Sequence, residues 1–346
     1  MSDGQPPAPR EQGWSHIVLA LAAFLLLPHA PGLPAVVPVV DTYLLLVPML
    51  TVFLILGWLA GGSLVLAVIW CLITAWVFVL PAPRDADTAY YALARGWALL
   101  VAGAFGIVCL AGRARPFFHR ALSAVGFAIL LAVLLVTFGR LDAGRAEHVI
   151  AAEYAARNAA AGVQMRALAG ALAERAPSLD DAVRTFVGQR ERDLQALSRI
   201  AAPLYPALLG LEALACCALA WALHHRLSRA RLGPPLAPIR RFAFSDQLVW
   251  ALVAGITMLV VPSLQALAVV GRNLVLFVGT LYALRGYGIY AWFISKRAAV
   301  TSVVVAVAIF PLSLVTVPAA VGLGLSDTWF DWRKRIGAKL SGSDGA

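Results

Sequence analysis

The stretch 202–223 reads APLYPALLGLEALACCALAWAL, and Glu212 is its only charged residue. A run of about 20 apolar residues is long enough to cross the hydrocarbon core of a bilayer as a helix. This stretch therefore predicts a transmembrane helix with an acid near its middle. A charge at that depth costs about 2.5–3.5 kcal/mol on the insertion scale, so we expect Glu212 to face the protein interior and to have a partner.

The whole chain shares this apolar character. Hydrophobic residues make up 61% of its 346 residues and charged residues 13%, against about 25% charged in an ordinary soluble domain. This composition excludes a water-soluble fold and predicts the lipid bilayer as the main solvent. The formal net charge is +10, but the cations gather just outside apolar runs, where they set topology and touch lipid headgroups. No soluble basic domain is present, so nucleic acid is not an expected partner.

Nine apolar runs are candidate membrane spans: 14–29, 42–60, 62–80, 91–112, 120–139, 201–223, 247–269, 272–294 and 299–323. The predicted fold is all-α, a polytopic transmembrane helix bundle of eight or nine spans with a helical hairpin insertion outside the membrane. The first run is the weakest, because its tail, PHAPGLPAVVPVV (28–40), is rich in proline. We expect this tail to be interfacial or re-entrant, which is tolerated only where protein covers the backbone.

Five segments follow from these runs. Residues 1–13 form a polar, proline-containing tail that we expect to be disordered. The other four segments are N-terminal membrane helices (14–139), a polar helical hairpin insertion (140–200), C-terminal membrane helices (201–325), and an interfacial helix with a tail (326–346).

Positive charges predict the orientation of the spans in the inner, cytoplasmic membrane of the cell. Arginine and lysine gather in three loops: 112–120, 224–241 and 295–297. These loops fall on one side if the count of nine holds, which predicts a cytoplasmic N-terminus and places 140–200 outside. The same count puts the basic stretch DWRKR (331–335) outside, against the rule. Either the count is one too high or low, or the run 299–323 is re-entrant.

The polar block 140–200 contains nine arginines, eight acids and many alanines, which is typical of helix. Its second half carries an alternating four-three pattern typical of a coiled-coil seam. The seam residues are Val183, Val187, Arg190, Leu194, Leu197 and Ala201. Two alternatives remain open: the two arms pack on each other, or they bind a partner protein.

The chain ends its last apolar run with GLGLSDTWFDWRKR (322–335). Tryptophans on one helical face with cations beyond them are typical of a helix lying in the headgroup layer. This pattern predicts a membrane anchor, with Ser326 or Asp327 at the start of its helix. The predicted anchor residues are Trp329, Trp332, Arg333, Lys334 and Arg335.

Two glycine patterns allow more than one interpretation. Gly57 and Gly61 form a GxxxG that fits either a tight turn or a helix-packing face. Gly286 and Gly288, beside Arg285, fit either close helix packing or a helix broken near a ligand. Close packing is the simpler explanation for this second pair.

The chain contains no HExxH, GxSxG, P-loop or GxGxxG motif, so we expect neither an enzyme nor a bound cofactor. The four cysteines lie inside apolar runs without metal-ligand spacing, and no metal site is expected. The pair His224–His225 adjoins an arginine-rich loop and is expected at the membrane interface.

The buried charges give the candidate ligand-binding residues. Arg285 lies in the middle of LVLFVGTLYALRGYGIYAWF (274–293), and intramembrane charges of opposite sign usually pair. Glu212 and Arg285 are therefore predicted to share one polar site. Arg272, Asn273 and Tyr282, from the same run as Arg285, are expected to extend it. An ion pair that only fixes helix register is the alternative.

Three stretches of the C-terminal third carry a resemblance: FAFSDQLVWALVAG (242–255), GRNLVLFVGTLYALRGYGIYAWF (271–293) and GLGLSDTWFDWRKR (322–335). Together they resemble the YybS-like family of bacterial multi-span membrane proteins of unknown function. That family is distantly similar to the substrate-binding subunits of energy-coupling-factor vitamin transporters. The resemblance implies a core of six spans that holds a small molecule.

Two functions are therefore expected. The first is the binding or transport of an unknown small molecule at a site near the membrane midplane. The second is a membrane scaffold or regulator that docks another membrane protein through the 140–200 hairpin.

Overall fold

The computed structural model describes residues 14–81, 88–111, 115–138, 143–294 and 313–335, and every regular element in these ranges is helical. The all-α prediction is therefore confirmed. The chain folds as two compact units, 1–236 and 237–346. The predicted disordered tail (1–13) lies outside the described residues.

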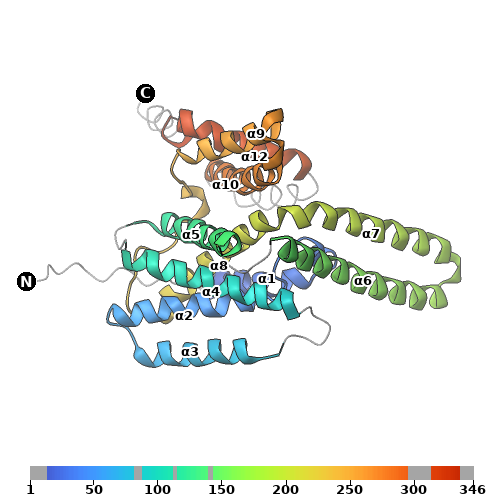
Figure 1. Ribbon diagram of the computed structural model, residues 1–346, viewed down its shortest axis with the longest axis horizontal. Helices are drawn as coiled ribbons and strands as arrows, with labels where there is room; N and C mark the ends of the chain where they lie inside the picture. The colour runs from blue at the N-terminus through green and yellow to red at the C-terminus, as the bar shows by residue number, and fades with distance from the viewer. Residues whose placement is uncertain (1–13, 82–87, 112–114, 139–142, 295–312, 336–346) are drawn as a thin grey trace, which may run out of the picture. The chain divides into compact units, whose positions relative to one another are not determined.

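In the first unit, six apolar helices form the main body (Figure 1). They are α1 (Trp14–Leu26), α2 (Tyr43–Leu59), α3 (Leu64–Val79), α4 (Thr88–Ala111), α5 (Phe117–Phe138) and α8 (Tyr205–Leu227). Helix α2 packs against α3, α4 and α8. At its centre the Phe53 ring lies edge-on to Phe105, with 4.6 Å between ring centroids, and to Trp221, at 5.5 Å. Aromatic packing of this kind adds to the area that these rings bury.

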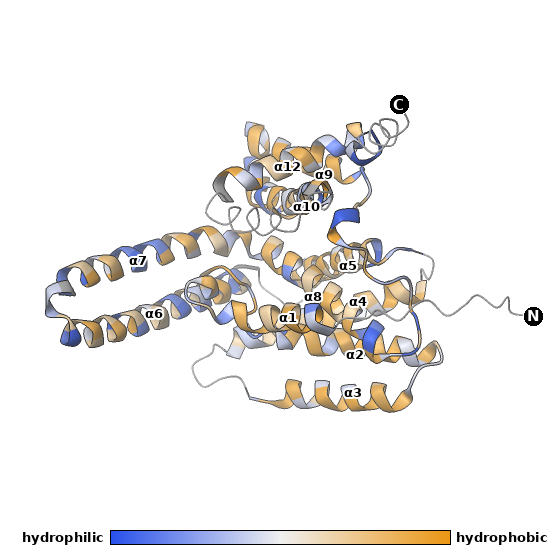
Figure 2. Cartoon of the chain, turned by 180° about the vertical axis from the view of Figure 1, so that it is seen from behind, coloured by the Kyte–Doolittle hydropathy of each residue, from blue (hydrophilic) through white to orange (hydrophobic). Residues whose placement is uncertain are grey.

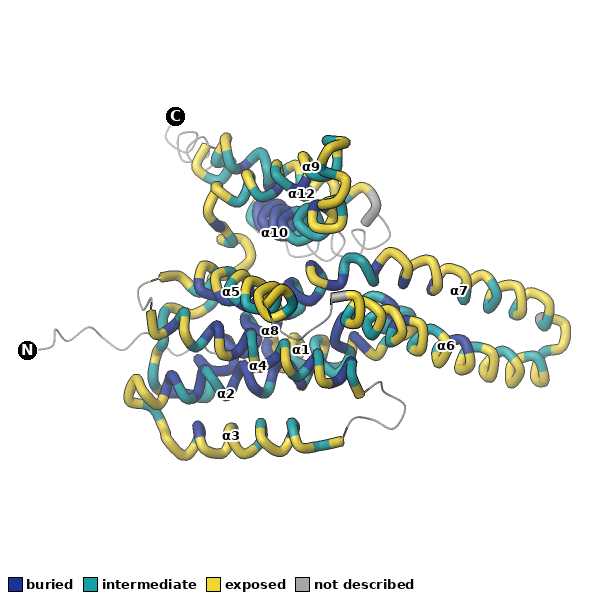
Figure 3. Tube along the Cα trace, viewed as in Figure 1, coloured by how far each residue is buried: buried dark blue, intermediate teal, exposed yellow. Residues whose placement is uncertain are grey.

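The outer faces of these helices remain apolar. Figure 2 shows hydrophobic residues along nearly all of α3, and Figure 3 shows that the same helix is mostly exposed. Its exposed side chains include Val65, Leu72 and Trp76. A soluble protein rarely exposes so large an apolar surface, so these faces are suited to contact lipid tails.

Four stretches of the described chain are long and apolar enough to cross a membrane: Thr88–Ala111, Phe117–Phe138, Asp180–Leu227 and Pro262–Phe293. Shorter apolar helices occupy Trp14–His29, Tyr43–Leu59, Leu64–Val79 and Leu248–Val260. Several apolar helices are thus present in this membrane protein, although the count of eight or nine spans is not confirmed. The predicted run 299–323 falls largely on 295–312, which lies outside the described residues.

Described parts of two of the predicted cytoplasmic loops are in contact within the first unit. Arg120, at the start of α5, is buried and donates from Nη1 to the Leu232 carbonyl at 2.9 Å. This contact joins the loop before α5 to the loop after α8. The prediction that loops 112–120 and 224–241 share one side agrees with it.

The predicted hairpin is present as α6 (Ala143–Arg175) and α7 (Asp180–Ala201), joined by the short helix η3 (Pro177–Leu179). In Figure 1 its two arms extend from the other helices of the first unit. Of the predicted seam, Leu194 and Ala201 are buried, whereas Arg190 and Leu197 are exposed. Val183 and Val187 are half-buried, so the predicted seam is packed at some of its positions and not as a continuous stripe.

The two glycines before α3 have different roles. Gly61 has φ +91° and forms the turn, in a conformation that side chains rarely adopt. A Cβ on Gly57 would lie 2.7 Å from Nε2 of His224, so Gly57 allows α2 to pack against α8. The turn and the packing interpretations of this GxxxG therefore both apply, one to each glycine.

The second unit contains η5 (Ile239–Arg241), α9 (Leu248–Val260), η6 (Pro262–Leu267), α10 (Ala268–Ile294) and α12 (Ser313–Phe330). Helices α10 and α12 approach closely at two glycines. A Cβ on Gly286 would lie 1.9 Å from the Ala320 carbonyl oxygen, and a Cβ on Gly324 would lie 2.0 Å from that of Tyr282. Close packing, the simpler explanation for Gly286, is therefore confirmed.

The C-terminal stretch differs from the predicted interfacial helix. Residues 326–330 are the end of α12, and the helix breaks at Asp331, which has φ +44°. A new helical turn follows at 332–335. Asp327 therefore does not lie at the start of a helix, as predicted, but inside α12. Its Oδ1 accepts from the backbone N–H of Trp332 at 3.0 Å and so caps the turn at 332–335.

Candidate small-molecule site around a non-helical segment

The proline-rich residues 27–41, called here the 27–41 segment, separate α1 from α2. They contain two single-turn helices, η1 (Leu27–His29) and η2 (Leu33–Ala35), and otherwise lack regular structure. Proline has no backbone N–H and breaks a helix, so the carbonyl groups of this segment need other partners. The expectation that protein must cover this backbone is confirmed by the contacts below.

Arg157 of α6 donates hydrogen bonds to three backbone carbonyl groups of this segment. Its Nη1 donates to the Val37 carbonyl at 2.9 Å and to that of Pro34 at 3.4 Å, and its Nη2 donates to that of Pro38 at 3.2 Å. Nε pairs with Glu153, one turn earlier, at 2.8 Å. A guanidinium is suited to this task because its donors point in several fixed directions.

Three tyrosines complete the cover of the segment. Tyr154 Oη donates to the Val36 carbonyl at 3.1 Å, and Tyr90 of α4 donates to that of Pro38. Tyr205 of α8 donates to Tyr90 Oη at 3.4 Å. Burial raises the pKa of the Tyr154 phenol, so that phenol stays protonated and remains a donor.

Glu212 of α8 holds the segment from the other side. Its Oε2 accepts from the backbone N–H of Val39 at 3.0 Å. Its Oε1 is buried and has no hydrogen-bond partner among the described residues. A buried carboxyl oxygen without a protein partner is unfavourable, so this oxygen is suited to bind a ligand group or a water.

Two cavities lie against the 27–41 segment. The first, of about 340 Å³, is lined by Glu212 and otherwise mainly by apolar residues of α1, α8 and the segment, including Phe24, Leu33 and Leu208. The second, of about 350 Å³, is lined by Asp41, Tyr90 and Arg157 among others. The segment therefore lies between an apolar cavity and a cavity with several polar groups.

Arg285, the other predicted buried charge, has two carboxylate partners in the second unit. Its Nε lies 2.9 Å from Asp327 Oδ2, and its Nη1 lies 2.8 Å from Asp246 Oδ1. The guanidinium also lies over the Phe244 ring, at 5.5 Å from the centroid. Arg285 and Glu212 each have a hydrogen-bond partner inside their own unit. A Glu212–Arg285 pair is therefore not needed to explain how either side chain is accommodated in the interior.

The three residues predicted to extend the site lie at different places on α10. Tyr282 is buried one turn from Arg285, with its ring 5.1 Å from that of Phe244. Arg272 and Asn273 lie about 18 Å from Arg285 along the axis of the helix. Arg272 is exposed, and Asn273 donates to the Val269 carbonyl of its own helix. These two residues therefore do not share a site with Arg285.

The predicted anchor residues are partly engaged by protein. Trp329 is exposed, as an anchor requires, but Trp332 donates from Nε1 to Ser326 Oγ at 2.9 Å. Arg333 donates to the Phe242 carbonyl at 3.0 Å. Lys334 pairs with Asp331, and Arg335 lies over the Phe330 ring. A role of this stretch at the headgroups stays a prediction.

The histidine pair is covered by protein. His224 and His225 are both buried in the last turn of α8, and their place at the membrane interface stays a prediction. They pack against Trp221, with 6.5 Å and 5.1 Å between ring centroids. No group of three metal-ligating side chains occurs among the residues that the structure describes.

Sequence reasoning missed three contacts of the segment, Arg157, Tyr154 and Tyr90, and also Tyr205, which binds Tyr90. Arg157 and Tyr154 belong to the polar block, where they look like surface residues of a hairpin arm. The available signal was the run of four prolines in 27–41, which requires donors from elsewhere in the chain. That signal does not say which residues supply them.

The chain was also compared with known proteins. No curated protein and no solved structure matches it. A family model matches less than half of the chain, including the stretches 242–255 and 271–293 that carry the resemblance noted above. The matched residues are 185–328, and the family is described as a predicted membrane protein (DUF2232).

Proposed function

We propose that this membrane protein binds a small molecule beside the 27–41 segment and helps to transport it. The observation that carries this proposal is Oε1 of Glu212, a buried oxygen without a described partner on a residue that lines an apolar cavity. Ligand sites are typically apolar hollows with a few placed polar groups. The distant similarity of YybS-like proteins to transporter substrate-binding subunits supports the same function.

The lining defines the class of molecule. Apolar side chains surround most of the 340 Å³ cavity, so the bound part of the molecule should be apolar. Glu212 presents apolar atoms to this cavity, and a change of its side-chain rotamer would let its carboxyl accept from a hydroxyl or bind an amine. This chemistry favours an amphipathic molecule with one donor group. Broken helices with exposed backbone groups form such sites in many transporters, and the 27–41 segment has this character.

A variant that fills the cavity tests this proposal. Ala215 lines the cavity from α8 and is exposed toward it, so Ala215→Phe should occupy the space without disturbing the helix. Ala92→Phe, at an exposed alanine of α4 outside this cavity, is the matched control. We expect solvent extracts of purified wild type and Ala92→Phe to contain the same small molecule by mass spectrometry. Its presence at equal amounts in Ala215→Phe would contradict the site.

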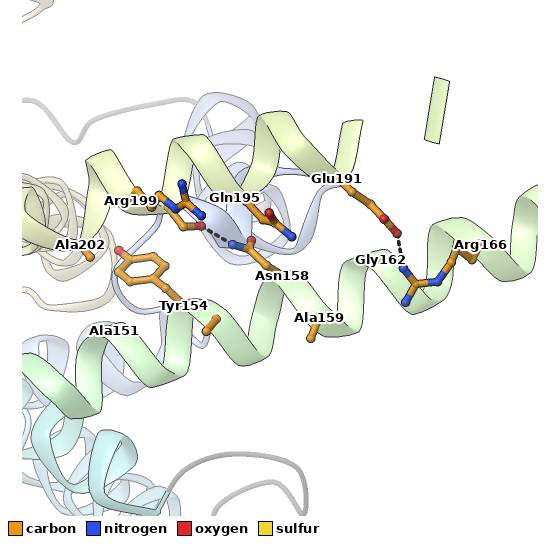
Figure 4. A pocket seen from close by; sticks show the side chains of 12 residues that line it. Ala151, Tyr154, Asn158, Ala159, Gly162, Arg166, Glu191, Gln195, Arg199 and Ala202 are labelled. Carbon is orange, nitrogen blue, oxygen red and sulfur yellow. Dashed lines mark hydrogen bonds and ion pairs between the residues drawn. The ribbon is translucent and has the colours of Figure 1, made fainter. Parts of the chain in front are cut away.

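A second function, docking of a protein through the hairpin, is favoured by a different observation. The arms α6 and α7 enclose a hollow of about 620 Å³. In Figure 4 the side chains of Asn158, Gln195 and Arg199 lie between the arms. Beyond this hollow, large apolar side chains such as Leu168 and Phe186 are exposed. Such side chains are suited to a partner helix.

Substitution at the hairpin tests the docking function separately. Leu168→Ser together with Phe186→Ser should remove a co-purifying membrane protein while leaving the small molecule in place. Ala215→Phe should have the opposite effect. Loss of a partner protein in Ala215→Phe but not in the hairpin variant would exclude the hairpin as the docking element.

A further inference from the structure

We propose that the second unit carries a binding site for a phosphate-bearing anion, formed by Arg240, Arg241, Arg333 and Trp292. These four residues line a cavity of about 290 Å³, called here the arginine cavity. The anion is either the headgroup of an anionic phospholipid or a free phosphate compound, since both present the same oxygens. This site is independent of the proposed site at Glu212, which belongs to the first unit.

Three separate parts of the unit bring these residues together. Arg240 and Arg241 belong to η5, Trp292 lies near the end of α10, and Arg333 follows α12. A Cβ on Gly288 would lie 2.4 Å from the Ile239 carbonyl oxygen, so this glycine allows η5 to lie directly on α10. Residues from both ends of the unit's sequence therefore converge on one hollow.

Arg333 is positioned rather than free to move. Its Nη2 donates to the Phe242 carbonyl at 3.0 Å, which fixes the guanidinium beside η5. Its Nε is buried and has no hydrogen-bond partner among the described residues. Burial also lowers the pKa of Arg333, so the guanidinium, which stays charged, would be stabilised by an anion beside it. The contact with the Phe242 carbonyl therefore holds this guanidinium at the wall of the cavity.

Among the residues that the structure describes, no acid lines the arginine cavity. The nearby acids are engaged elsewhere: Asp246 and Asp327 bind Arg285, and Asp331 binds Lys334. No ion pair of Arg240, Arg241 or Arg333 occurs within the described part of the chain. Three guanidinium groups around one hollow, without compensating carboxylates, leave a strong local excess of positive charge.

The chemistry of the lining selects phosphate. A guanidinium presents parallel N–H donors that match two phosphate oxygens, and the resulting hydrogen bonds are charge-assisted. Trp292 adds an amphipathic ring of the kind that occurs at the boundary between lipid tails and headgroups. Ordinary loop cations near a membrane lack this arrangement. Arg115 and Arg229, for example, are exposed like Arg240 and Arg241 but do not line the cavity.

The test uses the full chain in two arms. In the lipid arm, protein stripped of its lipids is titrated with phosphatidylglycerol, with phosphatidylcholine as the zwitterionic control, and bound lipid is counted by native mass spectrometry. In the phosphate arm, protein in phosphatidylcholine nanodiscs is titrated with pyrophosphate by calorimetry. Both arms compare wild type with Arg240→Gln/Arg241→Gln. The control Arg115→Gln/Arg229→Gln removes the same charge from exposed arginines of the first unit.

We expect Arg240→Gln/Arg241→Gln to weaken binding about tenfold or more in at least one arm, because each lost charge-assisted bond contributes more than a neutral one. The control should bind like wild type. A response in the lipid arm identifies a headgroup as the ligand, and a response in the phosphate arm identifies a soluble phosphate compound. Absence of binding in both arms, or equal losses in both double variants, would overturn the proposal.

Discussion

Arg285 on α10 and Asp327 on α12 form a buried ion pair, with 2.9 Å between Nε and Oδ2. Their side chains are 8% and 5% exposed, whereas that of Asp246, the second partner of Arg285, is 58% exposed. The same Asp327 also caps the last helical turn through its other oxygen. The Asp327 carboxylate therefore connects α10 to the helical turn at 332–335.

This relationship predicts unequal effects of two identical substitutions. Asp327→Asn leaves a buried guanidinium without its main counter-charge and should destabilise the protein by about 3–5 kcal/mol. Asp246→Asn removes a carboxylate that water already screens, so its effect should be about 1 kcal/mol or less. Unfolding in mixed micelles with increasing dodecyl sulfate measures both values. Equal effects would show that Asp327 is not the main partner.

The crossing of α10 and α12 predicts a strong effect of one added methyl group. In Gly286→Ala the new Cβ would lie 1.9 Å from the Ala320 carbonyl oxygen. Because that oxygen belongs to the backbone, the clash can be relieved only if α10 or α12 moves. Gly279→Ala is the matched control on the same helix, because nothing lies within 4 Å of its Cβ. We expect Gly286→Ala to lower the thermal unfolding midpoint sharply. Gly279→Ala should leave it unchanged or raise it slightly, since alanine favours helix.

Arg157 is predicted to restrain the backbone of the 27–41 segment. Arg157→Gln loses most of the hydrogen bonds to the Pro34, Val37 and Pro38 carbonyls. The amides of the four valines at 36, 37, 39 and 40 should therefore exchange with deuterium much faster. The control is Arg166→Gln. Arg166 lies on α6 like Arg157, but it forms an exposed pair with Glu191 of α7, so this substitution should leave the exchange unchanged. Unaltered exchange in Arg157→Gln would mean that the tyrosines and Glu212 hold the segment without it.

The contact between Arg333 and the Phe242 carbonyl predicts the side of the C-terminal basic stretch. Both residues lie at one place in the second unit, so DWRKR should share the cytoplasmic side with the loop 224–241. An even number of membrane crossings between the loop 224–241 and DWRKR then places both basic stretches in the cytoplasm, as the positive-inside rule requires. The count of nine spans had placed DWRKR outside.

Cysteine labelling tests this topology. Single cysteines at Ala237 and Lys334, in a Cys71→Ser background, should react with an impermeant maleimide only from the cytoplasm. A cysteine at Arg184, on the hairpin, should react only from the opposite side. Labelling of position 334 from the side that labels position 184 would contradict the shared location.

The sequence predicted the helices well because hydrophobic runs and helix-forming polar blocks are local signals. Most apolar helices and the 140–200 hairpin begin and end near their expected positions. The exceptions are α9, which ends at Val260 instead of 269, and α12, which continues to Phe330 instead of ending at 323. The contacts of the site could not be found in this way. Glu212 binds the amide of Val39 across 173 positions, and Arg157 binds the carbonyls of residues about 120 positions earlier. No spacing rule connects such residues.

The partner of Arg285 shows a second limit of the sequence. The charge rule for membrane spans predicted a partner for it, but Asp327 had been assigned to an interfacial helix. The break at Asp331, which makes residues 326–330 part of α12, depends on packing with α10 and has no clear local signal. Tertiary contacts thus changed the role of this acid.

The central claim, a small molecule bound beside Glu212, is tested most directly by native mass spectrometry of the intact protein released from mild detergent. Wild type and Glu147→Gln, an exposed glutamate of α6, should both carry the same added mass. Glu212→Gln keeps an acceptor for the Val39 amide but replaces the other oxygen, so we expect the added mass to disappear. A wild-type protein without any added mass, or a Glu212→Gln variant that retains it, would contradict the claim.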